Sequence, residues 1–495
     1  MNIEEAKEEL RHTVEAYLKK EDGEYCIAPI RQRPVFLMGP PGIGKTQIME
    51  QIARECNIGL VAYTITHHTR QSAVGLPFIK EEEFEGTKYS ITEYTMSEII
   101  ASIYHKMKET GQKEGILFID EINCVSETLA PTMLQFLQCK SFGNRKIPDG
   151  WIIVAAGNPP EYNKSVREFD MVTWDRVRRM DITADYNVWK KYAVDKKIHP
   201  ALLSYLAIRP QNFYKVETDV DGLHFVTARG WEDFSELLYV YEEMQNPVTT
   251  DVVYEYLRHS DIAQDVAAYI ELYRKYQDDY GIEKILQRKV PASVYERIYR
   301  AAFDERISVV HLLFDAVLEK MRKAQEQKKL TDSWYAFLKD YRSKVEDAQD
   351  KKTCYIGLLD QRMVQYRTKK KADLYERRER KREEKLLEQL KKSVPDETKD
   401  AKLAFEQAKE AFAIQCKQKE TADYEALDAL EAAFDFADAA FEKGEEMIVF
   451  VTDLTMTSIS AAFLAQHTCK RYYEYNKELL IGTRRQELLS ELAHE

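Results

Sequence analysis

The segment at residues 36–53 constrains the fold more than any other part of the chain. It reads FLMGPPGIGKTQIMEQIA, so an apolar run passes through a Gly/Pro-rich turn into a stretch with helical spacing. Residues 39–46 satisfy the pattern G-x-x-x-x-G-K-[ST], in which glycines let the backbone curl until successive N–H groups point at one anion. The N-terminus of the following helix adds partial positive charge. The segment therefore predicts a phosphate-binding loop between a strand and a helix.

Five short apolar runs follow one another between residue 35 and about residue 185. They are separated by helical or mixed sequence, and they read VFLMG, LVAYTI, GILFIDE, WIIVAAGN and RRMDIT. Runs that are apolar almost throughout are typical of strands covered by helices on both faces of a parallel sheet. The sequence therefore predicts an α/β P-loop core. Residues 76–95 and 139–151 interrupt the alternation, and their Gly-containing turns between β-prone arms predict two hairpins.

The rest of the chain is predicted to be helical. Strand patterns stop after residue 186, and apolar residues then recur at three- and four-residue intervals over most of the remaining sequence. The apolar run at 447–465 contains Asp453 and several hydroxyl residues, so we expect one buried helix rather than a membrane span. The predicted domains are an N-terminal helix and lead-in at 1–30, a nucleotide-binding core at 31–185, a small helical lid at 186–249 and an all-helical domain at 250–495.

Net charge and cysteine usage limit the classes of partner and compartment. The formal net charge of −12 opposes nonspecific binding to DNA, RNA or anionic lipid, because such binding depends on clustered Lys and Arg that neutralise phosphates. The seven cysteines show no C-x-x-C pair and no regular spacing, which favours reduced thiols. The first 20 residues are acidic and helix-patterned, unlike a secretory signal. We therefore expect a cytoplasmic protein without membrane insertion, for which nucleic acid is not the expected partner.

The phosphate loop supplies the first candidate site residues. Lys45 would reach the β- and γ-phosphates of a nucleotide, and the hydroxyl of Thr46 would ligate Mg²⁺. The alternative is a Gly/Pro turn that carries an exposed lysine. A guanine nucleotide would require N-K-x-D, and NKSV at 163–166 lacks the Asp, so ATP is favoured. The residues expected to contact the nucleotide are Gly39, Pro40, Pro41, Gly42, Ile43, Gly44, Lys45, Thr46 and Gln47.

Polar residues at the ends of two later apolar runs complete the predicted hydrolytic site. Asp120 and Glu121 end the run GILFIDE, where one carboxylate is needed to hold the metal and another to polarise the attacking water. We assign Asp120 to the metal and Glu121 to the general base, while a strand that simply ends in exposed acids is the alternative. Asn158 ends the next apolar run and could orient the water, although Asn before Pro also forms turns.

Arginine side chains are the remaining candidates, because a phosphoryl-transfer site needs positive charge that stabilises the transition state. Arg176 precedes the last predicted strand and would face outward, where it could enter the site of a neighbouring subunit. Arg178 and Arg179 compete for that role, and an ordinary basic helix end is the alternative. Arg229 begins a predicted helix beyond the sheet and could connect the lid to the γ-phosphate within one subunit.

Together these motifs resemble those of the AAA+ ATPases, and specifically the MoxR-like branch and its dynein-related, midasin-like relatives. The loop GPPGIGKT, the strand end LFIDEIN and the segments GNPP, DRV and TARG occur in that family's order between about residues 30 and 245. The two predicted hairpins fall where this branch carries its helix-two and pre-sensor insertions. The departures are Cys124 and Val125, where the branch commonly has Arg and Ala, and Ser72, where an Asp is usual.

The resemblance implies ATP hydrolysis with Mg²⁺ by a homo-oligomeric ring, usually a hexamer. The resemblance implies that Lys45, Thr46, Asp120 and Glu121 act within one subunit. It assigns Asn158 the role of first sensor and Arg229 that of second sensor. Arg176 would act across the interface between subunits. The resemblance also implies chaperone-like remodelling of a protein client, often with a partner that bears a von Willebrand factor A domain. Two alternatives remain open, a nucleic-acid-stimulated motor or loader and an ATP-dependent assembly switch with little turnover.

Overall fold

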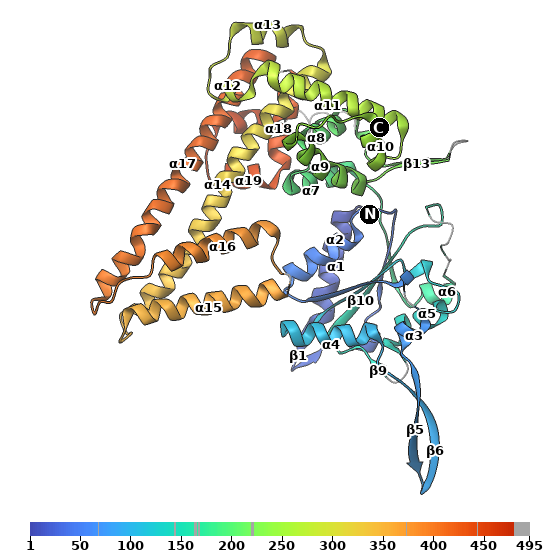
Figure 1. Cartoon of the computed structure of the whole chain (residues 1–495). Helices are drawn as coiled ribbons and strands as arrows, with labels where there is room; N and C mark the ends of the chain where they lie inside the picture. The colour runs from blue at the N-terminus through green and yellow to red at the C-terminus, as the bar shows by residue number, and fades with distance from the viewer. Residues whose placement is uncertain are drawn as a thin grey trace, which may run out of the picture. The chain divides into compact units, whose positions relative to one another are not determined.

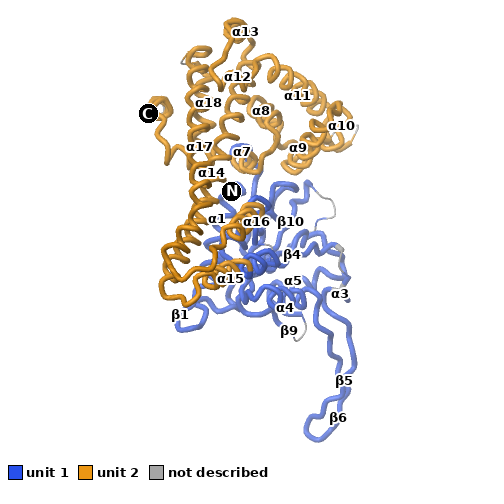
Figure 2. The backbone as a smooth tube through the Cα atoms, turned by 60° about the vertical axis from the view of Figure 1, so that its left-hand side comes forward, with its two compact units in different colours: residues 1–188, 364–378 blue, residues 189–363, 379–495 orange. Residues whose placement is uncertain are grey.

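The computed structural model divides the chain into two compact units (Figure 2). Unit 1 comprises residues 1–188 and 364–378, and unit 2 comprises residues 189–363 and 379–495. The residues that the structure describes are 1–67, 69–142, 145–162, 166, 169–218, 222–372, 374–442 and 444–479. Most of the NKSV pattern at 163–166 therefore lies outside the described residues.

A five-stranded parallel sheet forms the centre of unit 1, with the strand order β11-β3-β10-β7-β4 (Figure 1). The strands are β3 Val35–Met38, β4 Gly59–Thr64, β7 Gly115–Asp120, β10 Trp151–Gly157 and β11 Arg178–Asp181. Strands β3, β7 and β10 are buried over almost their whole length, as expected for strands with helices on both faces. Because the strands are parallel, their carboxyl ends meet at one edge of the sheet. The predicted α/β core is confirmed.

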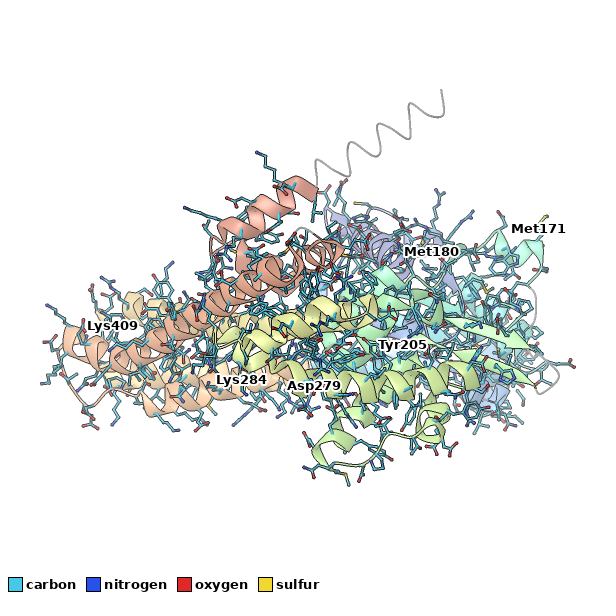
Figure 3. The ribbon with its side chains drawn as sticks, turned by 90° about the horizontal axis from the view of Figure 1, so that it is seen from above. Met171, Met180, Tyr205, Asp279, Lys284 and Lys409 are labelled. Carbon is cyan, nitrogen blue, oxygen red and sulfur yellow. The ribbon has the colours of Figure 1, made fainter. Side chains whose placement is uncertain are left out.

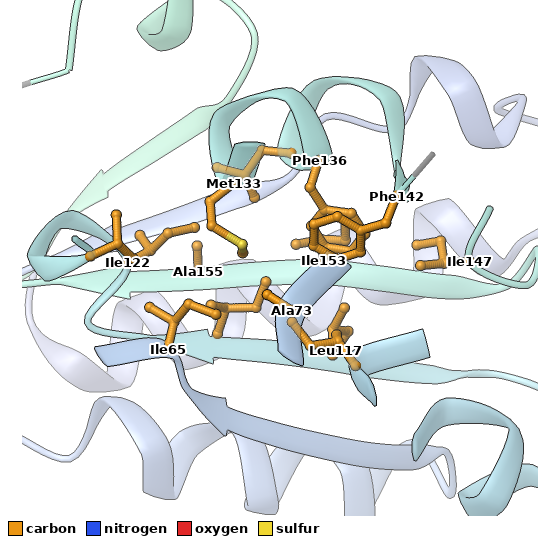
Figure 4. Close-up of a cluster of buried hydrophobic side chains, with 14 of the residues drawn as sticks. Ile65, Ala73, Leu117, Ile122, Met133, Phe136, Phe142, Ile147, Ile153 and Ala155 are labelled. Carbon is orange, nitrogen blue, oxygen red and sulfur yellow. The ribbon is translucent and has the colours of Figure 1, made fainter. Parts of the chain in front are cut away.

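Helices surround this sheet and close its core. They are α1 Ile3–Leu18, α2 Lys45–Glu55, α3 Arg70–Val74, α4 Glu98–Thr110, α5 Ala130–Cys139 and α6 Met171–Trp174, with 3₁₀ turns η1 Pro29–Arg31, η2 Ile65–His67 and η3 Ile122–Cys124. The ring of Phe136 on α5 stacks on that of Phe142 with 4.0 Å between centroids, and Met133 of α5 lies beside Ala155 of β10 (Figure 4). Burying one such side chain contributes about 2 kcal/mol. This packing holds the strand ends that carry the candidate site.

Both predicted hairpins are present in unit 1. The first joins β5 Pro77–Phe84 to β6 Thr87–Tyr94. The second joins β8 Ser141–Phe142 to β9 Arg145–Lys146, and its turn lies outside the described residues. A further short pair of strands, β1 Lys20–Glu21 with β2 Glu24–Tyr25, is not predicted from the sequence.

Unit 2 is mostly helical, as predicted for the C-terminal half. The long helices α14 and α17 lie side by side (Figure 1), and the rings of Trp334 and Phe412 contact each other between them at 5.8 Å. Figure 3 shows Tyr205 inside this unit and Lys409 of α17 extending from its surface. The helices are α7 Tyr186–Lys196, α8 Pro200–Ile208, α9 Ala228–Glu243, α10 Thr250–Tyr256, α11 Ser260–Tyr280, α12 Ile282–Leu286, α13 Ala292–Arg300, α14 Phe303–Val345, α15 Lys351–Lys371, α16 Arg377–Lys392, α17 Ala401–Phe441, α18 Glu445–Met456 and α19 Ser458–Leu464, with the 3₁₀ turn η4 Pro210–Asn212.

The boundary between the units does not follow helix ends. It falls in the first turn of α7, and the end of α15 with the start of α16, residues 364–378, belongs to unit 1. In unit 1, Glu376 of this segment lies 3.8 Å from Arg54 of α2. The domain boundaries inferred from the sequence stay predictions.

Two local predictions for unit 2 are wrong. Strands do occur beyond residue 186, because β12 Lys215–Thr218 pairs with β13 Leu223–Val226 in an antiparallel hairpin. Arms of four residues are too short for alternation to distinguish a strand from a loop. The run at 447–465 forms two helices rather than one, because α18 and α19 meet at Thr457 in extended backbone.

The α18–α19 pair also bears on the membrane prediction. No single helix among the described residues is long and apolar enough to cross a membrane. The α18–α19 pair passes the test of length and composition only when the two helices are taken together, and they are bent by 87°. Both helices bury apolar side chains inside unit 2, among them Phe450 and Leu454 of α18 and Phe463 of α19.

A charged cluster lies inside unit 2 where α7, α11, α14 and α18 meet. Asp453 of α18 lies 2.6 Å from Nζ of Lys190 and 3.4 Å from Nε2 of His311. Although burial opposes its ionisation, these two partners hold the pKa of Asp453 below its ordinary value. Burial raises the pKa of Asp315 to about 7, and the charge of Asp453 adds to the rise. The hydroxyl of Tyr273 donates to Oδ2 of Asp315 at 3.3 Å.

Replacing Asp315 with asparagine is expected to stabilise the protein at pH 8 and to have little effect near pH 4. The unfolded carboxyl ionises near 3.8 and the folded one near 7, so the wild type loses stability as pH rises between these values and does not regain it above them. Asparagine cannot ionise, and its oxygen can still accept from Tyr273. Because part of Asp315 reaches solvent, we expect a gain of about 1–2 kcal/mol at pH 8.

Denaturant unfolding at several pH values, compared with the exposed Asp340→Asn variant of the same helix, measures this gain. An Asp315→Asn effect that does not change with pH would contradict the assignment.

Candidate functional site

The phosphate loop leads from β3 into α2 as predicted, and its glycines are required by its geometry. Gly42 and Gly44 adopt positive φ values of 74° and 95°, a left-handed conformation that glycine adopts without strain. A Cβ at Gly39 would lie 2.8 Å from the carbonyl oxygen of Ile182, so a side chain there would displace β11. Gly44 is the N-cap of α2, and the positive end of that helix therefore faces the loop.

The ammonium of Lys45 lies within this loop. It donates hydrogen bonds to the carbonyl oxygens of Gly39 and Pro40, each at 2.8 Å, and to Oδ1 of Asn158 at 3.0 Å. The fold therefore brings together Lys45 and Asn158, which are distant in the sequence. The buried lysine also contradicts the alternative of a turn with an exposed side chain. An ammonium in this position places its charge where the phosphates of a nucleotide are expected.

Thr46 and Asp120 bring two side-chain oxygens close together. Thr46 is the second residue of α2, and its Oγ1 lies 3.4 Å from Oδ2 of Asp120 at the end of β7. Hydroxyl and carboxylate oxygens are hard ligands of the kind that Mg²⁺ binds, with waters and substrate phosphates usually completing its coordination. The two side chains therefore fit the predicted metal position.

Glu121 adopts an unusual backbone conformation immediately after β7. Its φ of 56° lies in the left-handed region, which costs about 1 kcal/mol or more for a residue other than glycine. Its N–H donates to Oδ1 of Asp120 at 2.9 Å, and its Oε2 accepts a hydrogen bond from Thr66 at 3.2 Å. The sequence analysis missed Thr66, which follows β4 in η2. The signal was available, because a polar residue after any strand of a parallel sheet lies at the same edge.

A second residue missed from the sequence, Asn123, positions Asn158. Asn123 is buried, and its Nδ2 donates to the backbone carbonyl of Asn158 at 2.8 Å. Gly157 allows this contact, because a Cβ there would lie 2.5 Å from Oδ1 of Asn123. Asn158 is therefore held through its own backbone by Asn123 while its side chain contacts Lys45.

The structure distinguishes the three candidate arginines. Arg178 donates to Glu9 and to Thr13 of α1, and Arg179 contacts Asp181 at 2.8 Å. Arg176 lies between α6 and β11 with an exposed side chain that donates to Oε1 of Gln138 on α5. Arg178 therefore fastens α1, whereas Arg176 is held by a neutral amide and forms no ion pair with any residue that the structure describes.

The remaining predicted residues take up less informative positions. Arg229 is the second residue of α9 in unit 2, and its side chain is exposed. Its role toward a nucleotide bound in unit 1 therefore stays a proposal. Among the loop residues, Ile43 is buried and Gln47 lies in the first turn of α2. Burial and the charges of Glu121 and Asp120 raise the pKa of Cys124, which disfavours the thiolate form that acts as a nucleophile.

The comparison with protein families agrees with this site at the level of an ATPase domain. Residues 35–173 match the family model described as ATPase family associated with various cellular activities, or AAA. Among solved structures, a candidate ATPase from Cytophaga hutchinsonii aligns with 16% sequence identity and a TM-score of 0.22, over 37% of this chain. The alignment spans 54%, or about half, of the length of that chain. A comparison with curated proteins finds no match.

Proposed function

We propose that this chain is a MoxR-like ATPase that uses ATP hydrolysis to remodel a protein partner, and the match of residues 35–173 to the AAA family model supports the ATPase part of this proposal. One observation carries the proposal. Five candidate residues lie at the carboxyl edge of the sheet, where Lys45 contacts Asn158. At the same edge Asp120 contacts the hydroxyl of Thr46 and the backbone N–H of Glu121. This set contains each group that hydrolysis of a nucleoside triphosphate requires within one subunit.

Each side chain has a distinct proposed task. Lys45 and the N-terminus of α2 bind the β- and γ-phosphates, and Thr46 and Asp120 hold Mg²⁺. When bound, Mg²⁺ neutralises negative charge on the phosphates. Glu121 accepts the proton of the attacking water on a carboxylate oxygen, and Asn158 orients that water toward the γ-phosphate. Thr66 and Asn123 keep Glu121 and Asn158 in place without touching the substrate.

A homo-oligomeric ring of six subunits, the number that the family resemblance implies, completes the proposal. The exposed Arg176 would enter the site of the adjacent subunit, while Arg229 would approach the phosphates of its own subunit. The proposed client is a protein, and the family resemblance implies a partner with a von Willebrand factor A domain. The proposed compartment is the cytoplasm. The helical unit 2 supplies surface for such partners.

ATP turnover measured across a range of protein concentrations tests this function. A ring that completes its site with Arg176 of a neighbour predicts a turnover number per subunit that rises steeply with concentration, in step with assembly seen by sedimentation. Turnover that is constant down to nanomolar concentration would contradict the ring. Added DNA or RNA should not stimulate turnover, whereas stimulation that falls steeply with salt would favour a nucleic-acid motor. Assembly with ATP but without turnover would favour a switch.

A further inference from the structure

The β5–β6 hairpin is a separate two-stranded sheet that projects from unit 1 (Figure 1). Glu85 and Gly86 form its turn, and their positive φ values of 50° and 80° are those of a type I′ turn. Within the described part of the chain, no third strand pairs with either edge. Its base is fastened by reciprocal contacts between Leu76 and Thr95, in which the N–H of Leu76 donates to Oγ1 of Thr95 and its carbonyl accepts from the N–H of Thr95, both at 2.9 Å.

Large apolar side chains of this hairpin are exposed. Ile79 is 77% exposed, Phe84 51% and Tyr89 52%, and Phe78 and Tyr94 are also exposed. An isolated two-stranded hairpin is only marginally stable in water, and stable examples pack their apolar side chains on another element. So many exposed apolar residues on one hairpin therefore mark a surface that a partner covers.

Register identifies which backbone groups of β5 face outward. Phe84 pairs with Thr87 across the two-residue turn, so these residues exchange backbone hydrogen bonds and every second pair along the hairpin does the same. The backbone N–H and C=O groups of Ile79, Glu81 and Glu83 therefore point away from β6. Such an edge can accept a further strand in extended conformation.

Charge distinguishes the β5 edge from the β6 edge. Lys80 is engaged by Glu82 at 2.6 Å and by Glu93 at 3.3 Å. Glu81 and Glu83 are exposed, and neither forms an ion pair in the part of the chain that the structure describes. An incoming strand would place every second side chain beside these two carboxylates and the alternate side chains beside Phe78 and Phe84 on the opposite face.

We propose that the β5 edge binds an extended polypeptide segment in which Lys or Arg alternates with apolar residues, by adding it as a third strand. Backbone hydrogen bonds to Ile79, Glu81 and Glu83 would supply affinity, while the two carboxylates and the exposed aromatic rings would supply selectivity. The inference rests on the proposed remodelling function in taking this segment to belong to the remodelled protein. Binding itself requires no nucleotide.

Fluorescence anisotropy with the full chain and no nucleotide tests the proposal. The probe is a labelled peptide of about ten residues in which Lys and Val alternate, compared with peptides that replace Lys by Glu or place Pro at every third position. We expect the Lys peptide to bind at least about tenfold more tightly than either control, and its affinity to fall as salt is raised from about 50 to about 500 mM.

Two proline variants at directly paired positions locate the binding edge. Glu81 and Ser90 face each other across the hairpin, and the N–H group of each points outward, so proline at either position leaves the β5–β6 hydrogen bonds intact. Glu81→Pro should weaken peptide binding by about tenfold or more, Ser90→Pro should not, and Glu81→Gln should have an intermediate effect that disappears at high salt.

Three outcomes would overturn the proposal. They are equal binding of all peptides, loss of binding with Ser90→Pro instead of Glu81→Pro, and self-association of the chain that Glu81→Pro abolishes, which would make a second copy the occupant. ATP binding and thermal unfolding, measured on every variant, show whether unit 1 remains folded. They also separate the two proposals, because a chain that fails to bind ATP could still bind the peptide.

Discussion

Replacing Glu121 with glutamine is expected to lower the ATP turnover number by about 100-fold or more and to leave ATP affinity within about threefold. Glutamine has nearly the same shape and can still accept the hydrogen bond that Thr66 donates to Oε2. It cannot accept a proton from water at neutral pH. The loss should therefore appear in turnover, while binding through Lys45, Thr46 and the loop persists.

Single-turnover hydrolysis and equilibrium ATP binding, measured on the same preparation, separate these two effects. Glu109→Gln, an exposed glutamate on α4, is the matched control and should behave as wild type. If Glu121→Gln hydrolyses ATP at the wild-type rate, Glu121 is not the general base. If the variant loses ATP binding as well, the left-handed backbone at residue 121 supports the loop rather than the chemistry.

Replacing Arg176 with alanine is expected to reduce turnover by about 100-fold to 1000-fold without loss of ATP binding. The side chain is exposed and bound to the amide of Gln138, so its removal breaks no ion pair with the residues of unit 1 that the structure describes and should leave the free energy of unfolding nearly unchanged. Arg179→Ala, three residues further along the chain, is the matched control, and its turnover should remain close to that of wild type. Arg178→Ala should instead destabilise α1, because it removes the contacts with Glu9 and Thr13.

Mixing two inactive variants tests whether Arg176 acts across an interface. A subunit with Arg176→Ala retains Glu121, and a neighbour with Glu121→Gln retains Arg176, so a mixed ring would contain some interfaces with both groups intact. We expect the mixture to recover part of the wild-type turnover that neither variant shows alone. Absence of any recovery, with mixed assembly confirmed by sedimentation, would show that Arg176 acts within its own subunit or elsewhere.

The parallel sheet of unit 1 and the edge that carries its candidate site could be predicted from the sequence, because the patterns that indicate them are local and repeated. The five strands are short apolar runs. Asp120 ends one of them, Glu121 and Asn158 each follow one directly, and Lys45 begins the helix after the loop that follows β3. In a parallel sheet this position alone places side chains at a common edge. The hairpin turn at Glu85 and Gly86 is similarly local, since glycine accommodates its left-handed backbone.

Features that depend on contacts between distant segments could not be predicted. Asn123 is recognisable as a positioning residue only once Gly157 is beside it. The sequence has no proline or glycine at Thr457 that would indicate the end of a helix there. The fold of unit 2 decides where this helix ends, because both helices bury apolar side chains there although they are bent by 87° at this point.

Calorimetric titration of the purified chain with ATP and Mg²⁺ tests the central claim, that the loop around Lys45 binds a nucleoside triphosphate. We predict saturable binding of one ATP per chain, weakened about 100-fold or more by Lys45→Ala and substantially by omission of Mg²⁺. A wild-type chain that gives no binding isotherm with ATP and Mg²⁺, or a Lys45→Ala variant that binds as tightly as wild type, would contradict it.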